Sequence, residues 1–260
     1  MKISVVIAVS AYEIDKLREC LLSVKSFANE IIIFSLGMED RRVGEKLKGV
    51  SAKVVRTEKP KYIEVLRNKM AESAAGPWIL MLDPDERLTK TLKEKLKEIS
   101  REDKFSVVNI PRKNIFFGHW IAHTSWWPDK QLRFFKKGSL VWSQTIHKYP
   151  EVHGKVLDLP AIKENALEHY GFDNLIEFID RHNRYSSVEA ENLNKDGVKY
   201  GFLAMTWQIL REFVRRYTKH QGYLDGFWGF ALSYLMAFYK LTVWVKLWQI
   251  QQKYENRHGL

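Results

Sequence analysis

The chain of 260 residues contains one cysteine, Cys20, and therefore cannot form an intrachain disulfide. A single thiol fits a reducing compartment, and its position on the apolar side of a predicted helix indicates a small core residue. His119, His123 and His147 lack the tight His or Cys pairing that zinc sites use, so we do not expect zinc. The chain has neither an internal repeat nor a low-complexity segment, which excludes repeat architectures.

Long uninterrupted apolar runs are also missing. Residues 227–239 are apolar, but Lys240 and Lys246 interrupt the continuation through Val245, whereas a spanning helix needs about 20 consecutive apolar residues. A single membrane span stays an alternative for this segment. Near the N-terminus, one lysine precedes the short apolar run Ile3–Val9, which is too brief and too weakly charged for a signal peptide. We interpret that run as the first strand of a sheet.

Positive charge is in excess. Lysine and arginine number 42 against 31 aspartates and glutamates, which gives a formal net charge of +11. Such an excess indicates an anionic partner, namely nucleic acid, an acidic membrane surface or a phosphorylated substrate. The length suits one large core, or a core with a small second domain.

The most informative segment is an apolar run, Trp78–Leu82, that ends in Asp83-Pro84-Asp85-Glu86. A short apolar run between Gly76-Pro77 and acidic residues is typical of a buried strand. In an open α/β sheet, ligands bind outside the carboxyl ends of the strands. Asp83 and Asp85 would lie there, where hard oxygen ligands suit Mg²⁺ or Mn²⁺ with a diphosphate. The alternative is that Asp85 or Glu86 caps a helix beginning near Leu88.

Further strands and helices alternate before this segment. We expect strands at residues 3–9, 30–34 and 53–56, and helices at residues 14–24 and 63–74. This alternation predicts a parallel, doubly wound α/β sheet. Asp83 and Asp85 then follow the fourth strand.

Several motifs carry a resemblance to a known family. They are Ser4-Val5-Val6-Ile7, Cys20-Leu21-Leu22-Ser23-Val24, Asn29-Glu30-Ile31-Ile32, Arg67-Asn68 and Leu82-Asp83-Pro84-Asp85-Glu86-Arg87-Leu88. A second, more specific set is Pro111-Arg112-Lys113-Asn114, Gly118-His119-Trp120-Ile121, Trp127-Pro128-Asp129, Leu132-Arg133-Phe134-Phe135, His147, His169-Tyr170 and Gly222-Tyr223-Leu224-Asp225-Gly226-Phe227. In this order the motifs resemble glycosyltransferase family 2, the inverting transferases of GT-A fold, and within it the lipopolysaccharide core β-1,4-glucosyltransferases.

The resemblance implies a GT-A catalytic domain over residues 1–170, with a Rossmann-like, mostly parallel sheet flanked by helices. The donor would be a nucleotide-diphospho-sugar, UDP-linked, with Mg²⁺ or Mn²⁺ held by Asp83 and Asp85. The implied donor-binding residues are Ser10, Tyr12, Glu13, Arg67, Asn68 and Asp83. The acceptor would be lipid-linked or a glycan such as lipopolysaccharide, and no nucleic-acid partner is expected.

The chain departs from the family pattern at three positions. Ser35 replaces an Asp at the end of the second strand, and Tyr12-Glu13 replaces Asn-Glu after the first. The family's His-Glu pair, whose Glu is a candidate base, is His147-Lys148 here. The candidates for the general base are therefore Asp129, His147 and Glu151. We favour Asp129, which the rigid Trp127-Pro128 would hold beside aromatic walls, and His147 comes second.

Residues 171–260 are predicted to be helical and to associate with a membrane. One stripe of the helix at 201–219 is apolar, with Leu203, Trp207, Leu210, Val214 and Tyr217. The other side carries Arg211, Arg215, Arg216, Lys219 and Glu212. A basic amphipathic helix before a Trp-rich apolar one favours a peripheral anchor on the anionic, cytoplasmic face of the cell membrane. The alternatives are a packed helical layer or a contact between copies in a homo-oligomer.

Two other classes of function fit parts of the sequence. The aspartate pair also suits a metal-dependent phosphohydrolase or nuclease, although two-metal chemistry requires further acids at other strand ends, and Ser35 occupies one such position. The positive charge also suits a non-catalytic protein that binds acidic membrane surfaces or nucleic acid.

Overall fold

The computed structural model describes residues 1–60, 63–143 and 149–258, which divide into two compact units. The first unit comprises residues 1–113 and 128–170, and the second comprises residues 114–127 and 171–260. The predicted boundary after residue 170 coincides with one of these transitions. Residues 114–127, which we had expected in the first domain, instead group with the helices of the second unit.

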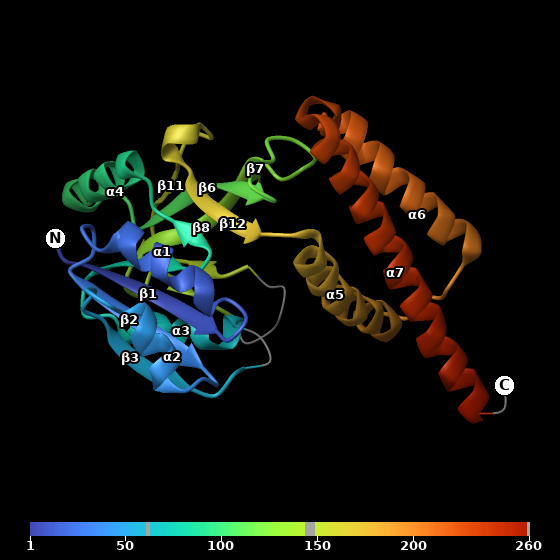
Figure 1. Ribbon diagram of the computed structural model, residues 1–260, viewed down its shortest axis with the longest axis horizontal. Helices are drawn as coiled ribbons and strands as arrows, with labels where there is room; N and C mark the ends of the chain where they lie inside the picture. The colour runs from blue at the N-terminus through green and yellow to red at the C-terminus, as the bar shows by residue number, and fades with distance from the viewer. Residues whose placement is uncertain (61–62, 144–148, 259–260) are drawn as a thin grey trace. The chain divides into compact units, whose positions relative to one another are not determined.

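The first half of the first unit alternates strands with helices (Figure 1). The strands are β1 (Ile3–Ser10), β2 (Glu30–Leu36), β3 (Lys53–Thr57), β4 (Trp78–Leu82) and β5 (Glu86–Arg87). The helices are α1 (Ile14–Val24), α2 (Asp40–Lys46), α3 (Glu64–Ser73) and α4 (Lys90–Glu102). The predicted strands and helices of this region are therefore confirmed, with small shifts of their ends.

Strands predominate after α4. They are β6 (Val107–Phe116), β7 (His119–Trp120), β8 (Asp129–Lys136), β9 (Leu140–Val141), β10 (Glu151–Val152), β11 (Val156–Asp158) and β12 (Leu167–Phe172), with a 3₁₀ turn, η1, at Lys163–Asn165. The main sheet of the described chain has the strand order β3-β2-β1-β4-β8-β6-β12-β5. Strands β3, β2, β1 and β4 are parallel, whereas β8 is antiparallel to both β4 and β6. The sheet is thus mixed, with its parallel half at the N-terminal end of the chain.

Apolar side chains cover both faces of the parallel strands. On one face, Val5 and Ile7 of β1 pack in a core with Leu17 of α1 and Leu92 of α4. On the other face, Val6 packs with Met70 of α3 and its neighbours. Burial on both faces explains the nearly continuous apolar sequence of these strands. Because the strands are parallel, their carboxyl ends share one edge, and this edge carries Ser10, Ser35 and Asp83.

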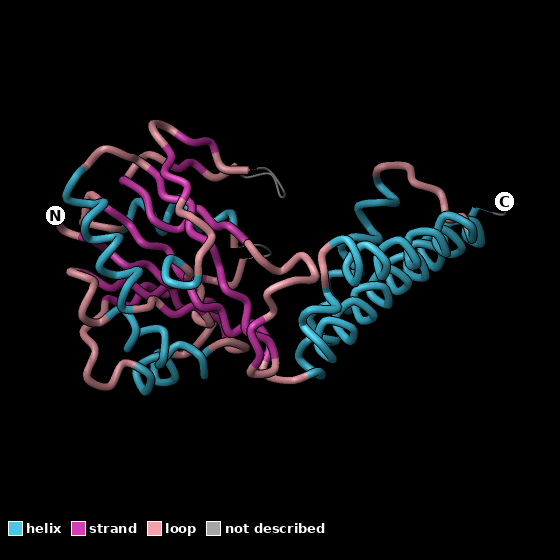
Figure 2. Tube along the Cα trace, turned by 90° about the horizontal axis from the view of Figure 1, so that it is seen from above, coloured by secondary structure: helices cyan, strands magenta, loops and turns pink. Residues whose placement is uncertain are grey.

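The second unit consists mainly of helices, which lie alongside one another in Figure 2. They are α5 (Leu175–Lys195), α6 (Phe202–Val214), a π-helical segment at Arg215–Lys219, η3 (Gly222–Asp225) and α7 (Gly226–His258). Helix α7 contacts both α5 and α6 along the unit. It continues through Lys240, which therefore interrupts the apolar run without interrupting the helix.

Residues 114–127 are fixed to the second unit by Asp225. Its carboxylate accepts backbone N–H bonds from Ala122 (3.3 Å) and His123 (2.8 Å) and contacts the His123 ring at 2.8 Å. Gly222 is required here because a Cβ would lie 2.6 Å from the Thr124 side chain. At Gly229 a Cβ would clash with the backbone of Gly222 itself. The Gly222–Phe227 motif of the sequence is therefore structural.

The outer surface of the helical unit is strongly apolar. The exposed apolar residues of α6 are Phe202, Leu203, Trp207, Leu210 and Val214, and those of α7 are Phe227, Phe230, Tyr234, Phe238, Val245 and Trp248. Ring contacts from Phe213 of α6 to Phe230 and Tyr234 of α7 join the two sets. Within the described residues, the segment 222–252 is the one helix that is long and apolar enough to cross a membrane by length and composition.

A candidate active site at the carboxyl ends of the parallel strands

Asp83 lies directly after β4, where a charged cluster occupies the carboxyl edge of the sheet. Arg133 of the neighbouring strand β8 donates a short hydrogen bond to the Asp83 carboxylate, and the Arg133 side chain is almost fully buried. Burial alone would raise the pKa of Asp83, but Arg133, Arg67 and Arg112 outweigh it and hold that pKa well below its usual range. Asp83 is therefore the ionised, half-buried partner of a buried arginine.

Glu86 is a second carboxylate partner of Arg133. It is fully buried, and its carboxylate accepts hydrogen bonds from the Asp83 backbone N–H (2.9 Å), Arg133 (3.0 Å) and Arg112 (3.4 Å). Burial raises the pKa of Glu86, and the nearby cations only partly offset that effect. The alternative that Asp85 or Glu86 caps a helix is wrong, since the cap of α4 is Thr89, which accepts from the Leu92 N–H at 3.2 Å.

Asp85 points to a different partner from Asp83. One carboxylate oxygen lies 3.3 Å from Nε2 of His169, a residue of β12, and both side chains are largely buried. The backbone carbonyl of Asp85 also accepts from the Tyr170 N–H at 2.8 Å, which fixes the turn against β12. The structure therefore separates the two aspartates: Asp83 neutralises a buried arginine, and Asp85 is held beside an imidazole.

This donor set fits a divalent cation that is shared with a substrate. Within the described residues, no cluster of three or more His, Cys, Asp or Glu side chains forms a complete protein cage for a metal. Mg²⁺ is commonly bound by one or two carboxylates together with substrate phosphates. Asp85, with an imidazole beside it, matches that pattern, and carboxylates suit Mg²⁺ or Mn²⁺. Asp83 is less available because Arg133 already occupies its carboxylate.

Two predicted donor-binding residues of α3 have distinct environments. Arg67 is mostly buried, and its Nε has no hydrogen-bond partner in the described part of the chain. Burial and the neighbouring Arg133 lower its pKa, although Asp83 opposes this. The side-chain amide of Asn68 forms two hydrogen bonds with the backbone of Trp142. It donates to the carbonyl and accepts from the N–H, both at 2.8 Å. Arg67 is thus ready for an anionic ligand, whereas Asn68 positions the segment around Trp142.

The predicted residues after β1 lie at the same edge of the sheet. Ser10 is buried and donates to the Glu13 carboxylate at 3.1 Å. Tyr12 is 77% exposed, and the Lys59 ammonium lies 4.6 Å from its ring centre. An exposed ring at a strand end could stack on a planar base, so a role for these residues in donor binding stays a prediction.

The three candidate bases differ in what the structure says of them. Asp129, the first residue of β8, accepts from Arg112 through Nε (2.8 Å) and Nη2 (2.6 Å), and from Gln131 at 2.8 Å. Both of its oxygens are therefore engaged. Glu151 of β10 is well exposed and lies 3.7 Å from His153. His147 lies outside the described residues.

Three residues of the cluster, Arg112, Arg133 and His169, were not assigned a role from the sequence, and Glu86 was considered only as a helix cap. Arg133 did carry a signal, because it is a lone charge in the otherwise apolar strand Leu132–Phe135. A charge in such a strand requires a buried partner, and the acidic end of β4 was the obvious candidate. The contact between His169 and Asp85 carried no such signal, since it depends on the pairing of β5 with β12.

Taken together, the fold and the site define an α/β protein whose ligand site lies at the carboxyl ends of parallel strands. The model of the family described as glycosyl transferase family 2 matches residues 4–151. This match covers more than half of the chain, so the chain belongs to glycosyl transferase family 2 and is a glycosyltransferase of GT-A fold. The resemblance to glycosyltransferase family 2 is confirmed.

Individual relatives are distant. An uncharacterized glycosyltransferase of Rickettsia typhi is 24% identical over 251 residues, covering 93% of this chain and 85% of the relative. The lipopolysaccharide core biosynthesis glycosyltransferase LpsC of Rhizobium meliloti is 25% identical over 181 residues, covering 68% of this chain and 66% of that protein. Among solved structures, S. aureus TarS is 18% identical with a TM-score of 0.44, covering 83% of this chain and 43% of that chain.

Proposed function

We propose that this glycosyltransferase moves a hexose from a UDP-linked donor to a lipid-linked or glycan acceptor, with inversion, at the cytoplasmic face of the cell membrane. The observation that carries the proposal is the pairing of Asp85 with His169 directly after β4, at the carboxyl edge of the parallel strands where open α/β sheets bind ligands. The similarity to LpsC supports a lipopolysaccharide acceptor as the first to test.

The donor diphosphate would lie between Arg67 and Asp85. The unpartnered Nε of Arg67 supplies a hydrogen-bond donor and positive charge for a phosphate oxygen. Asp85 and, on displacement from Arg133, Asp83 would hold the Mg²⁺ or Mn²⁺ ion, with His169 orienting Asp85. When bound, that ion supplies Lewis-acid stabilisation of the departing nucleotide. Ser10, Tyr12 and Glu13 would contact the base.

The simplest test of this assignment is a thermal-shift screen of nucleotide-sugars with and without Mn²⁺. A ligand that binds only the folded state raises the apparent melting temperature by mass action. We expect the largest shift with a UDP-sugar and Mn²⁺ together, followed by transfer or slow donor hydrolysis in an activity assay. A shift with other nucleotides that equals the UDP shift would contradict the donor assignment.

We expect Asp129→Asn to lower turnover by roughly 10²-fold or more, the usual contribution of a general base. The substitution removes the proton acceptor but keeps the shape of the side chain, so UDP–Mn²⁺ affinity should be retained. Steady-state kinetics with calorimetry of UDP binding measure both. To act as base, Asp129 must exchange its Arg112 contact for the acceptor hydroxyl.

The matched control is Gln131→Ala, which removes the neutral hydrogen bond to the other oxygen of Asp129 and leaves the carboxylate. This variant should keep near-normal turnover. If Asp129→Asn is as active as the control, the base assignment moves to His147, and the inactivity of His147→Ala becomes the next test.

The helical unit supports membrane association through its outer surface. The stripe Leu203, Trp207, Leu210 and Val214 of α6 is 82%, 62%, 56% and 44% exposed. Large contiguous apolar surfaces mark interaction sites. An orientation across the membrane is disfavoured because α5 packs along α7 and carries charges such as Glu177, Arg181 and Glu189. Each charge at the bilayer centre costs about 2.5–3.5 kcal/mol on insertion scales.

We therefore expect the unit to lie in the interface, with the apolar stripe toward the acyl chains. The double change Leu203→Ser and Trp207→Ser should weaken vesicle binding by about 10²-fold, because burying each such side chain contributes about 1.5–3 kcal/mol. Flotation with vesicles of varied phosphatidylglycerol content measures this. High salt should lower binding of the unaltered protein without abolishing it, since salt screens only the charge contribution.

The control pair is Leu22→Ser and Tyr149→Ser, which are exposed apolar residues of the first unit. It should leave flotation unchanged. If the unaltered protein does not float with vesicles of any lipid composition, the apolar surface is instead a contact between copies of the chain. Light scattering should then show a homo-oligomer.

A further inference from the structure

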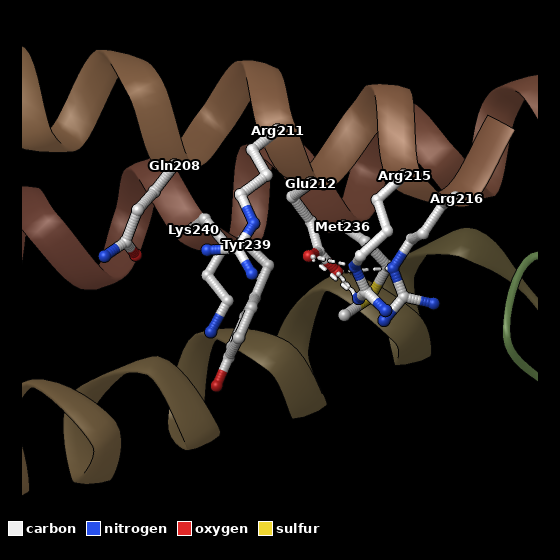
Figure 3. Close-up of a pocket in the computed structure, with 8 residues that line it drawn as sticks. All are labelled: Gln208, Arg211, Glu212, Arg215, Arg216, Met236, Tyr239 and Lys240. Carbon is white, nitrogen blue, oxygen red and sulfur yellow. Dashed lines mark hydrogen bonds and ion pairs between the residues drawn. The ribbon is translucent and has the colours of Figure 1, made fainter. Parts of the chain in front are cut away.

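A second polar site lies within the helical unit. A cavity of about 450 Å³ is lined by Gln208, Arg211, Glu212, Arg215, Arg216, Met236, Tyr239 and Lys240 (Figure 3). Four of these side chains are cations and one is a carboxylate. Such a surplus of positive charge around one cavity indicates an anionic ligand.

Glu212 organises two of the cations. Its buried carboxylate accepts from Arg215 at 2.9 Å and from Arg216 at 2.6 Å. Burial alone would raise the pKa of Glu212, but Arg216 and Arg215 outweigh it and keep that pKa below its ordinary value, so the carboxylate is ionised. One negative charge thus holds two guanidinium groups in place and neutralises only one of them. Arg216 is fixed further by its bond to the Thr124 carbonyl at 2.6 Å.

The other two cations occupy the opposite end of the cavity. Lys240 of α7 is paired with Glu189 of α5 at 2.6 Å. Arg211 has no hydrogen-bond or ion-pair partner among the residues that the structure describes. Figure 3 shows Arg211 of α6 extending to the same side as Arg215 and Arg216 of the π-helical segment that follows it. Arg211 therefore contributes an unengaged guanidinium to a cavity whose other arginines are already held in position.

The position of Arg211 connects the cavity to the exposed apolar stripe. On a helix, residues three and four apart are neighbours, so Arg211 lies beside both Trp207 and Val214. Those two side chains belong to the exposed stripe of α6, whereas Arg211 lines the cavity. Along this single helix an apolar surface borders a cationic cavity. A ligand that has both an apolar tail and an anionic head matches this arrangement.

We propose that this cavity binds the phosphomonoester headgroup of a membrane lipid, and that Arg211 donates hydrogen bonds to its phosphate oxygens. A phosphomonoester presents three acceptor oxygens and a charge between −1 and −2 near neutral pH. Guanidinium groups match phosphate oxygens in pairs of parallel hydrogen bonds. This inference rests on the membrane association proposed above, because a membrane lipid would supply the phosphate group. It gives the cavity no role in the transfer of the sugar.

The test is flotation of the full chain with two kinds of phosphatidylcholine vesicles. One contains phosphatidic acid, a phosphomonoester, and the other contains phosphatidylglycerol, a phosphodiester, adjusted to the same zeta potential. The unaltered protein should prefer phosphatidic acid by about tenfold, the factor that corresponds to one additional charge-assisted hydrogen bond of about 1.4 kcal/mol. Arg211→Ala should abolish the preference while leaving the protein bound to both vesicles.

The control is Lys195→Ala, an exposed cation near the end of α5 outside the cavity. Loss of one cation near an anionic surface weakens binding by up to about fivefold, so this variant should lose affinity for both vesicles equally and keep the preference. Equal binding of the unaltered protein to both vesicles, or a preference that survives Arg211→Ala, would overturn the proposal.

A competition arm separates a lipid headgroup from free phosphate. Lysophosphatidic acid should compete with phosphatidic acid vesicles, whereas inorganic phosphate at the same concentration should not. Equal competition by inorganic phosphate would overturn the lipid source. The unchanged donor binding of Arg211→Ala in calorimetry with UDP and Mn²⁺ distinguishes a failure here from a failure of the proposed transferase site.

Discussion

Asp85→Asn should lower sugar transfer by about 10³-fold or more and remove the Mn²⁺ dependence of UDP binding. Asp85 is the carboxylate at the strand ends that lies beside an imidazole, while Asp83 is occupied by Arg133. A bound cation contributes several kcal/mol to the stabilisation of developing charge, which corresponds to this loss in rate. Asparagine keeps the size and one oxygen of the side chain, so the fold should be retained.

Calorimetry of UDP with and without Mn²⁺, together with circular dichroism, measures these outcomes. The matched control is Asp158→Asn, whose carboxylate is exposed on β11 and pairs with Lys130. The control should bind and turn over normally. Unchanged Mn²⁺-dependent affinity in Asp85→Asn would show that the metal assignment is wrong.

The parallel half of the fold was readable from the sequence for a simple reason. Strands β1, β2 and β4 are buried on both faces, so each is an apolar run with a clear polar end. Their helices carry apolar residues at helical spacing, and the polar ends of the strands mark the ligand edge. The location of Asp83 and Asp85 at that edge followed from these two patterns alone.

The partners of the two aspartates were not readable in the same way. Arg133 reaches Asp83 across the antiparallel pairing of β8 with β4, and His169 reaches Asp85 through the pairing of β12 with β5. These pairings join segments about 50 and 80 residues apart in sequence, and no local periodicity encodes such contacts. From the sequence, both Asp83 and Asp85 are predicted to hold the metal ion, whereas the structure gives each a different neighbour.

Segment 114–127 illustrates a second limit. The predicted catalytic domain over residues 1–170 included this segment, but its backbone is held by Asp225 and by the bond from Arg216 to the Thr124 carbonyl. Those bonds come from residues about 100 positions later. The apolar composition of this segment indicated that it is buried. Which unit it packs in depends on long-range hydrogen bonds, which the composition does not encode.

Arg133→Met should destabilise the first unit by about 3–5 kcal/mol at neutral pH, because removing one partner of a buried ion pair leaves uncompensated charge. Two carboxylates, Asp83 and Glu86, depend on this guanidinium; Arg133 and Glu86 are buried, whereas the Asp83 side chain is 34% exposed. Urea unfolding followed by fluorescence measures the loss. Methionine fills a similar volume, so the loss reports charge and not a cavity.

The pH dependence of that loss identifies its cause. In the unaltered protein the pKa of Asp83 is depressed, so its stabilising contribution is present above its unfolded pKa and is lost as the pH falls through the folded value. Without Arg133 the same carboxyl loses the cation that lowers its pKa most, so its pKa rises and the folded state gains by protonation. The difference between the two proteins should therefore shrink below about pH 4. A difference that stays constant with pH would mean that packing, not charge, was lost.

The triple change Arg133→Met, Asp83→Asn and Glu86→Gln removes the charges together and should recover most of the stability at neutral pH. A buried ion cluster that is replaced as a whole by neutral groups of similar size is often no less stable than the original.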